Sequence, residues 1–176
     1  MDPTQQRIED LKKFADEYAL FDAAFREIPN EKLSLLKKGD EYSLSGLIVH
    51  VTEILAFYTD VINRISILPA GHATEFHVSQ DISDYSKKIM HDGVAPSDRP
   101  RMLEVLKRTQ RYFDDRVNQL PPDVYTVQTP IFYDDDGKSA MTSPALVVKW
   151  VTEHYIDHTK TIRDEIGPPP EVIPGK

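Results

Sequence analysis

The sequence predicts an all-α protein built as a four-helix bundle, and three observations support this fold class. Four long stretches repeat apolar residues at steps of three or four, as the buried face of a helix does. Proline or glycine follows each stretch and marks its end. The segment between the second and third stretches runs for roughly thirty residues, which is long enough to form a crossover between two parallel helices.

The first two helices are expected over about residues 4–28 and 43–67. Pro29 ends the first helix, because a proline disfavours helical geometry in the residue before it. Ser43 is the expected N-cap of the second helix, and Pro69 lies just beyond its end. The two apolar stripes consist of Ile8, Leu11, Ala15, Tyr18, Phe21, Phe25 and Ile28, and of Leu44, Leu47, Val51, Ile54, Tyr58, Val61 and Ile65.

The last two helices are expected over about residues 100–120 and 143–166. The third helix stops at Pro121. The fourth begins with Ser143 as a cap and Pro144 at the first helical position, where a missing amide hydrogen costs nothing.

The connections predict three smaller features. Residues 81–93, inside the long crossover, have the charge distribution of a short helix that lies over one end of the bundle. Residues 124–142, between the third and fourth helices, combine β-branched and aromatic residues with an Asp-Gly turn, which indicates a small β-hairpin. The tail, residues 167–176, is rich in proline and is expected to be extended. The whole chain, residues 1–176, is expected to form a single domain.

Composition excludes several classes of partner. The chain has 21 Lys and Arg against 29 Asp and Glu, and its net charge of −8 repels phosphate backbones and anionic lipids. We therefore expect no nucleic-acid and no membrane partner.

The first residues lack the apolar run of a signal peptide, so a cytoplasmic protein is expected. Because the chain has no cysteine, any metal must be held by His, Asp or Glu.

Three of the six histidines fall on the buried stripes of two helices. His154 and His158 are four residues apart, so a helix presents both imidazoles on one face. His50 stands between Leu47 and Ile54 on the stripe of the second helix and is also expected to face the interior.

Burial of three imidazoles without partners is unfavourable, and one divalent metal ion would remove the penalty. Three histidine ligands leave a fourth position open to water or substrate, which is the arrangement of catalytic zinc sites. Nickel, copper, iron and manganese also accept imidazole ligands. The alternative is that His50, His154 and His158 are core histidines that only form hydrogen bonds.

Two segments carry a resemblance to a known family. SLSGLIVHVTEILAFYTDVINRI contains one inward histidine, and VVKWVTEHYIDHTKTIRDEI follows about a hundred residues later with a His-x-x-x-His pair. This pattern resembles the DinB/YfiT-like superfamily over residues 4–166.

The resemblance implies an up-down-down-up four-helix bundle, a homodimer, and a metal triad at His50, His154 and His158. The metal it implies is a divalent ion, zinc or nickel. The activity it implies is metal-dependent hydrolysis or thiol S-transfer on a small-molecule substrate, the latter with an exogenous low-molecular-weight thiol. Two alternatives remain open, namely a non-catalytic metal-binding or sensing bundle and a structural dimerisation module without metal.

Other polar residues have competing interpretations. Glu53 and Asp157 could orient His50 and His154 or reach the metal, although such residues are more often solvated flanks. The run 134–137 lacks the ligand spacing of an EF-hand and is better explained as the hairpin turn.

The remaining histidines and three aromatic residues also allow two interpretations. Histidines in the crossover could line the mouth of the site, or they could be surface residues; they are His72, His77 and His91. Aromatic residues at helical spacing are expected to belong to the core rather than to a substrate platform; they are Tyr58, Trp150 and Tyr155.

Overall fold

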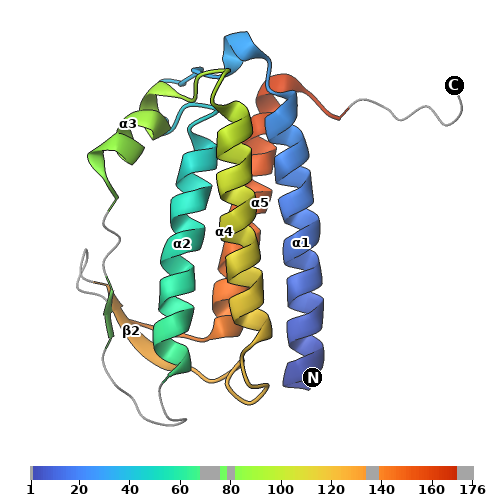
Figure 1. Cartoon of the computed structure of the whole chain (residues 1–176), viewed down its shortest axis with the longest axis vertical. Coiled ribbons are helices and arrows are strands. Elements are labelled where there is room, and N and C mark those ends of the chain that lie inside the picture. The colour runs from blue at the N-terminus through green and yellow to red at the C-terminus, as the bar shows by residue number, and fades with distance from the viewer. Residues whose placement is uncertain (1, 68–75, 79–81, 134–138, 170–176) are drawn as a thin grey trace, which may run out of the picture.

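The chain folds mainly into α-helices, with one small sheet (Figure 1). A computed structural model describes residues 2–67, 76–78, 82–133 and 139–169. The helices are α1 (Pro3–Glu27), α2 (Leu47–Ser66), α3 (Asp84–Asp92), α4 (Arg99–Asn118) and α5 (Pro144–Ile166), and a 3-10 turn covers Asn30–Lys32. The prediction of a mostly helical protein with a small hairpin is confirmed.

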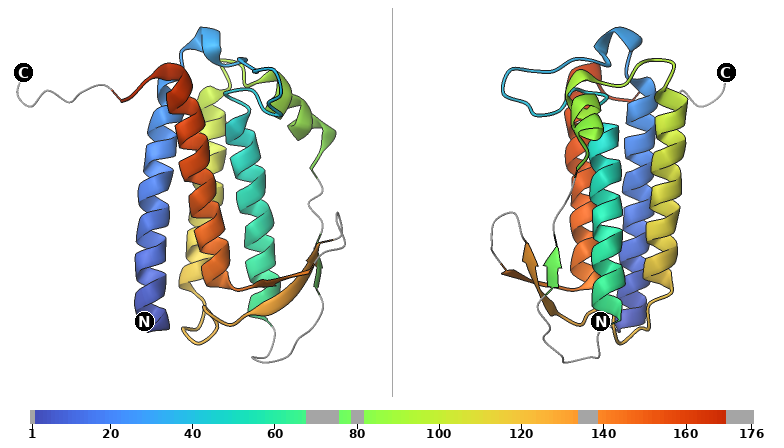
Figure 2. Two further views of the ribbon diagram at one scale, coloured as in Figure 1. Left: turned by 180° about the vertical axis from the view of Figure 1, so that it is seen from behind. Right: turned by 60° about the vertical axis from the view of Figure 1, so that its left-hand side comes forward.

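Four long helices lie side by side in all three ribbon views (Figures 1 and 2). α1 packs on α5, α2 packs on α4, and α2 also contacts α5. The colours of Figure 1 show that α1 and α5 run in one direction and that α2 and α4 run in the other. The chain therefore travels back along the molecule between α2 and α4, and α3 lies in this connection.

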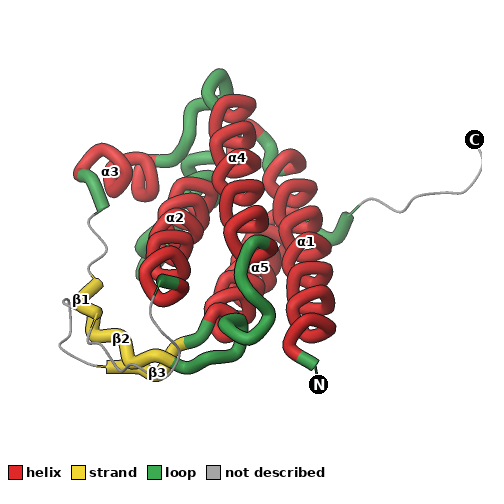
Figure 3. The backbone as a smooth tube through the Cα atoms, turned by 60° about the horizontal axis from the view of Figure 1, so that its bottom comes forward, coloured by secondary structure: helices red, strands yellow, loops and turns green. Residues whose placement is uncertain are grey.

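The sheet has three strands in the order β1 (Phe76–Val78), β2 (Thr129–Tyr133), β3 (Ser139–Thr142). β2 and β3 are antiparallel and form the predicted hairpin, whose turn at 134–138 lies outside the described residues. β1 pairs in parallel with β2 and was not among the elements expected from the sequence. The sheet lies near the end of the molecule where α5 begins, whereas α3 lies at the other end (Figures 1 and 3).

The starts of α2 and α5 test the predicted caps. α5 begins as expected, because the Ser143 hydroxyl accepts a hydrogen bond from the Leu146 amide at 3.2 Å and Pro144 is the first helical residue. The predicted start of the second helix at Ser43 is wrong, since α2 begins at Leu47 and a turn precedes it. The Ser43 hydroxyl instead accepts from Gly46 and donates to the Met90 carbonyl at the end of α3.

The short helix predicted within 81–93 is present as α3. The Ser83 hydroxyl caps its first turn by accepting from the Ser86 amide at 3.1 Å. Gly93 ends it with a φ of 92°, a conformation that residues with a side chain rarely adopt. Among the residues that the structure describes, no helix is long and apolar enough to cross a membrane.

Aromatic packing joins α1, α4 and α5 in the core. The Tyr155 ring is fully buried, and its centroid lies 5.5 Å from those of Phe14 and Phe21. Phe14 in turn lies 5.1 Å from Phe113 of α4. The prediction that Tyr155 belongs to the core is confirmed, and Tyr58 and Trp150 pack against the same core with their centroids 6.0 Å apart.

Gly46 allows the start of α2 to approach the end of α3. Its φ of −65° is ordinary for a helix, so the backbone conformation does not require glycine. A methyl group at this position would overlap with the carbonyl oxygen and Cα atom of Met90, which belong to rigid backbone.

We expect Gly46→Ala to lower the free energy of unfolding by about 2 kcal/mol, because the two backbones must separate. Denaturant unfolding measures this value. Gly39→Ala is the control: its φ of 100° makes alanine strained, but no neighbour lies within 4 Å, so the cost should be only about 1 kcal/mol. A Gly46→Ala cost no greater than that of the control would contradict the close approach.

Candidate metal centre

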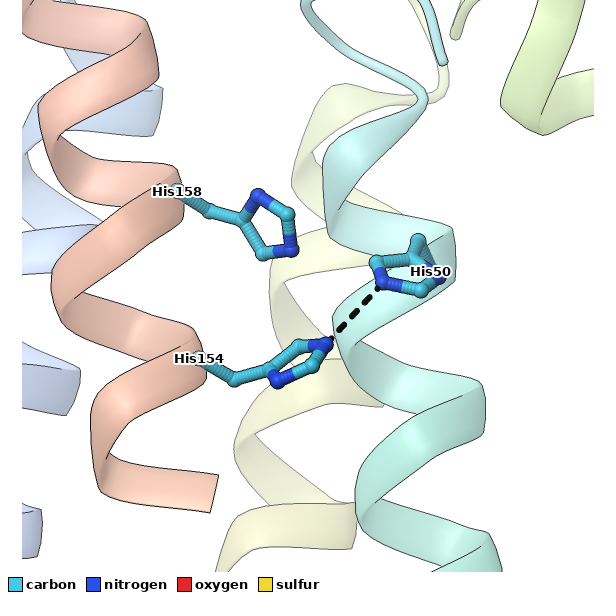
Figure 4. Close-up of side chains that lie close together, drawn as sticks. All are labelled: His50, His154 and His158. Carbon is cyan, nitrogen blue, oxygen red and sulfur yellow. Dashed lines mark hydrogen bonds between the residues drawn. The ribbon is translucent and has the colours of Figure 1, made fainter. Parts of the chain in front are cut away.

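Three histidines from two helices converge between α2 and α5 (Figure 4). His50 lies in the first turn of α2, and its side chain points toward α5. His154 and His158 lie on successive turns of α5 and point toward α2. The structure therefore brings together all three predicted ligands, and the inward orientation expected from the apolar stripes is confirmed.

The distances between the rings suit one small cation. One ring nitrogen from each histidine can be chosen so that all three lie within 4.8 Å of one another. The Nε2 atoms of His50 and His154 are 3.2 Å apart. Two nitrogens on a tetrahedral zinc ion are about 3.3 Å apart, because each bond is about 2.0 to 2.1 Å long. One pair already has the spacing of metal ligands, and the nitrogen chosen from His158 lies within 4.8 Å of both.

Hydrogen bonding inside the core does not account for the triad. His50 and His154 can share one hydrogen between their Nε2 atoms, which satisfies that pair. The Nε2 atom of His158 is buried and has no hydrogen-bond partner, and the same is true of the Nδ1 atom of His50. An unpaired buried polar nitrogen costs about 1 to 3 kcal/mol of stability. A metal ion bound to the Nε2 atom of His158 would remove this cost.

Burial keeps the three imidazoles neutral. It lowers the pKa of His50 to about 4, with a smaller contribution from His154. Burial, with smaller contributions from His50 and His154, lowers the pKa of His158 to about 3. Burial also lowers the pKa of His154, and the smaller effect of the Asp157 charge is to raise it. At neutral pH all three nitrogens can therefore donate a lone pair, as metal binding requires.

No carboxylate joins the three histidines in the described part of the chain, so the group offers three protein ligands. Glu53 is committed elsewhere, since it accepts a hydrogen bond from the Ser86 hydroxyl of α3 at 2.6 Å. Asp157 is exposed and influences His154 through its charge. The interpretation of Glu53 as an acceptor for His50 is wrong, because the Nδ1 atom of His50 has no partner.

The crossover histidines do not add to the site where the structure describes them. His91 is 65% exposed on α3 and pairs with Asp92 at 2.8 Å. His72 and the side chain of His77 lie outside the described residues, as does the acidic run 134–137.

Tyr42 is a neighbour of the triad that was not expected from the sequence. Its ring stacks on that of His50 with centroids 4.2 Å apart and an interplanar angle of 19°. It also lines a pocket of about 190 Å³ together with Leu44, Leu47 and Thr161. No periodicity could have identified Tyr42, because it stands in the irregular segment before α2.

No protein-family model matches this chain, and no curated protein or solved structure matches it.

Proposed function

We propose that His50, His154 and His158 hold one divalent metal ion, zinc or nickel, and that the protein is a metal-dependent enzyme acting on a small molecule. The observation that carries this proposal is the buried Nε2 atom of His158, which has no partner although it lies beside two other imidazoles. The depressed pKa values support it, since protons compete weakly with a metal at neutral pH.

We further propose that the four long helices form an up-down-down-up bundle of the DinB/YfiT type. The helix directions in Figure 1 and the single histidine followed by a His-x-x-x-His pair support this assignment. Homodimer formation, which goes with the same assignment, stays a prediction, and so does a cytoplasmic location.

The number of ligands favours catalysis over a purely structural metal. Structural zinc sites are closed by four protein ligands, whereas three ligands leave a position for water or substrate. A divalent ion at this position would act as a Lewis acid and lower the pKa of a coordinated water or thiol. Because the chain has no cysteine, the nucleophile would be water in a hydrolase or an exogenous low-molecular-weight thiol in an S-transferase.

A pocket of about 190 Å³ lies beside the triad, on the far side of Tyr42, which lines the pocket and stacks on His50. None of the three histidines lines this pocket.

Metal titration of protein prepared without a histidine tag tests the proposal. After removal of metal with a chelator, the chain should bind one equivalent of zinc or nickel. Zinc at ten times its dissociation constant should stabilise the fold by about 1.4 kcal/mol. For a chain of this length, that corresponds to a rise in melting temperature of about 3 to 6 °C.

The exposed His91 provides the matched control, because His91→Ala removes a histidine outside the triad and should leave both results unchanged. Absence of binding, with the same melting temperature before and after chelation, would favour a structural bundle with core histidines. Binding of one metal without turnover of any thiol or hydrolase substrate would favour a non-catalytic metal-binding or sensing protein.

A further inference from the structure

The orientation of His50 needs an explanation that hydrogen bonding does not supply. A histidine that binds metal through one nitrogen usually donates the other N–H to a carboxylate, carbonyl or water, which fixes the direction of the ring. His50 faces the triad with Nε2, and its Nδ1 atom is buried without a hydrogen-bond partner. The usual restraint is therefore missing from this ligand.

Tyr42 provides a different restraint. The two rings are nearly parallel, with an angle of 19° and a centroid distance of 4.2 Å, so the phenol ring covers one face of the imidazole. Rotation of His50 about its χ2 angle would break this stacking. Stacked pairs are favourable beyond the area they bury, and the preference depends on ring orientation.

The backbone next to Tyr42 is held firmly in place. The Ser43 amide and hydroxyl both donate to the carbonyl oxygen of Met90, at 2.8 and 3.0 Å. The Leu44 amide donates to the Leu35 carbonyl at 2.8 Å. Ser43 and Leu44 are both buried. Tyr42 therefore projects from an anchored segment, and its ring can act as a fixed support rather than a mobile cover.

We propose that Tyr42 is a positioning residue that sets the direction of His50 by ring stacking, in place of the hydrogen bond that usually orients a metal-bound histidine. This inference rests on the proposed function, because positioning of His50 matters only if His50 is a ligand. The aromatic ring of Tyr42 orients His50, and the phenol hydroxyl is not required.

Two variants separate the ring from the hydroxyl. We expect Tyr42→Ala to weaken zinc binding by about tenfold, the lower end of what loss of a supporting partner costs a metal site. Tyr42→Phe keeps the ring and should bind zinc within about twofold of the wild type. Tyr85→Ala removes an exposed tyrosine of α3 and should have no effect. The d–d absorption of bound cobalt should change in Tyr42→Ala and be retained in Tyr42→Phe, since it reports ligand geometry rather than stability.

The metal-free protein gives an independent test of the ring stacking between Tyr42 and His50. Stacking on Tyr42 should shift the carbon-bound ring protons of His50 upfield in the proton NMR spectrum, and this shift should disappear in Tyr42→Ala and persist in Tyr42→Phe. If the wild type binds no metal, the proposed function fails and the positioning role fails with it, even if the NMR shift shows that the rings are stacked.

Two further results would overturn the inference while leaving the metal site intact. One is a Tyr42→Ala protein that binds zinc with wild-type affinity and has the wild-type cobalt spectrum. The other is a Tyr42→Phe protein that binds zinc as weakly as Tyr42→Ala. That result would show that the phenol hydroxyl, and not the ring, positions His50. Melting temperatures of the metal-free variants identify any loss of zinc affinity that comes from unfolding.

Discussion

Replacing His158 with alanine is expected to weaken zinc binding by at least about 100-fold, more than the loss of a partner outside the ligand set usually costs. The variant removes one of only three protein ligands that the described residues offer, and no carboxylate stands beside the triad to replace it. Competition with a chromophoric chelator measures the affinity. His154→Ala should have an effect of the same order, because the two histidines occupy equivalent places on successive turns of α5.

His91→Ala is the matched control for these variants, since it removes an exposed imidazole and leaves the triad untouched. The metal-free His158→Ala protein should stay folded, because the change deletes a nitrogen that has no hydrogen-bond partner. Equal metal affinity in His158→Ala and in the wild type would remove the triad from consideration as the metal site.

The long helices and the triad were predictable because the signals that specify them are local and repetitive. A stripe of apolar residues reports which side of a helix is buried, and a histidine on that stripe must face the interior. His50, His154 and His158 were found in this way, without knowledge of how α2 and α5 pack. The Ser143-Pro144 start of α5 was predictable for a similar reason, since the cap and the first turn lie within a few residues.

The features that were missed depend on contacts between distant segments. Ser43 has the chemistry of an N-cap, but its hydroxyl donates to Met90, and α2 begins four residues later at Leu47. β1 has only three residues, which is too short for a recognisable alternation, and it exists through pairing with β2. Tyr42 reaches His50 because the following residues are tied to α3, and nothing in the residues around Tyr42 indicates that contact.

Acid should destabilise the metal-free protein through its buried histidines. Histidines in the unfolded chain bind protons near pH 6.5, whereas burial lowers the folded pKa of His50 to about 4 and that of His158 to about 3. Below pH 6.5 the unfolded chain thus holds more protons than the native protein, so the free energy of unfolding falls as the pH falls. The slope is about 1.4 kcal/mol per pH unit for each histidine that stays neutral. Because the unfolded histidines are only half protonated at pH 6.5, these two residues together should cost about 3 kcal/mol between pH 6.5 and 5.

Urea unfolding between pH 6.5 and 5, with a chelator present, measures this slope. His158→Gln should reduce the slope by about 1.4 kcal/mol per pH unit. A stability that is flat across this range would mean that the triad is not buried in the neutral form. The same pKa values bear on the pH at which metal should be lost. Unperturbed histidines would lose it near pH 6.5, but the low pKa values of His50 and His158 mean that protons compete for these ligands only in more acidic solution.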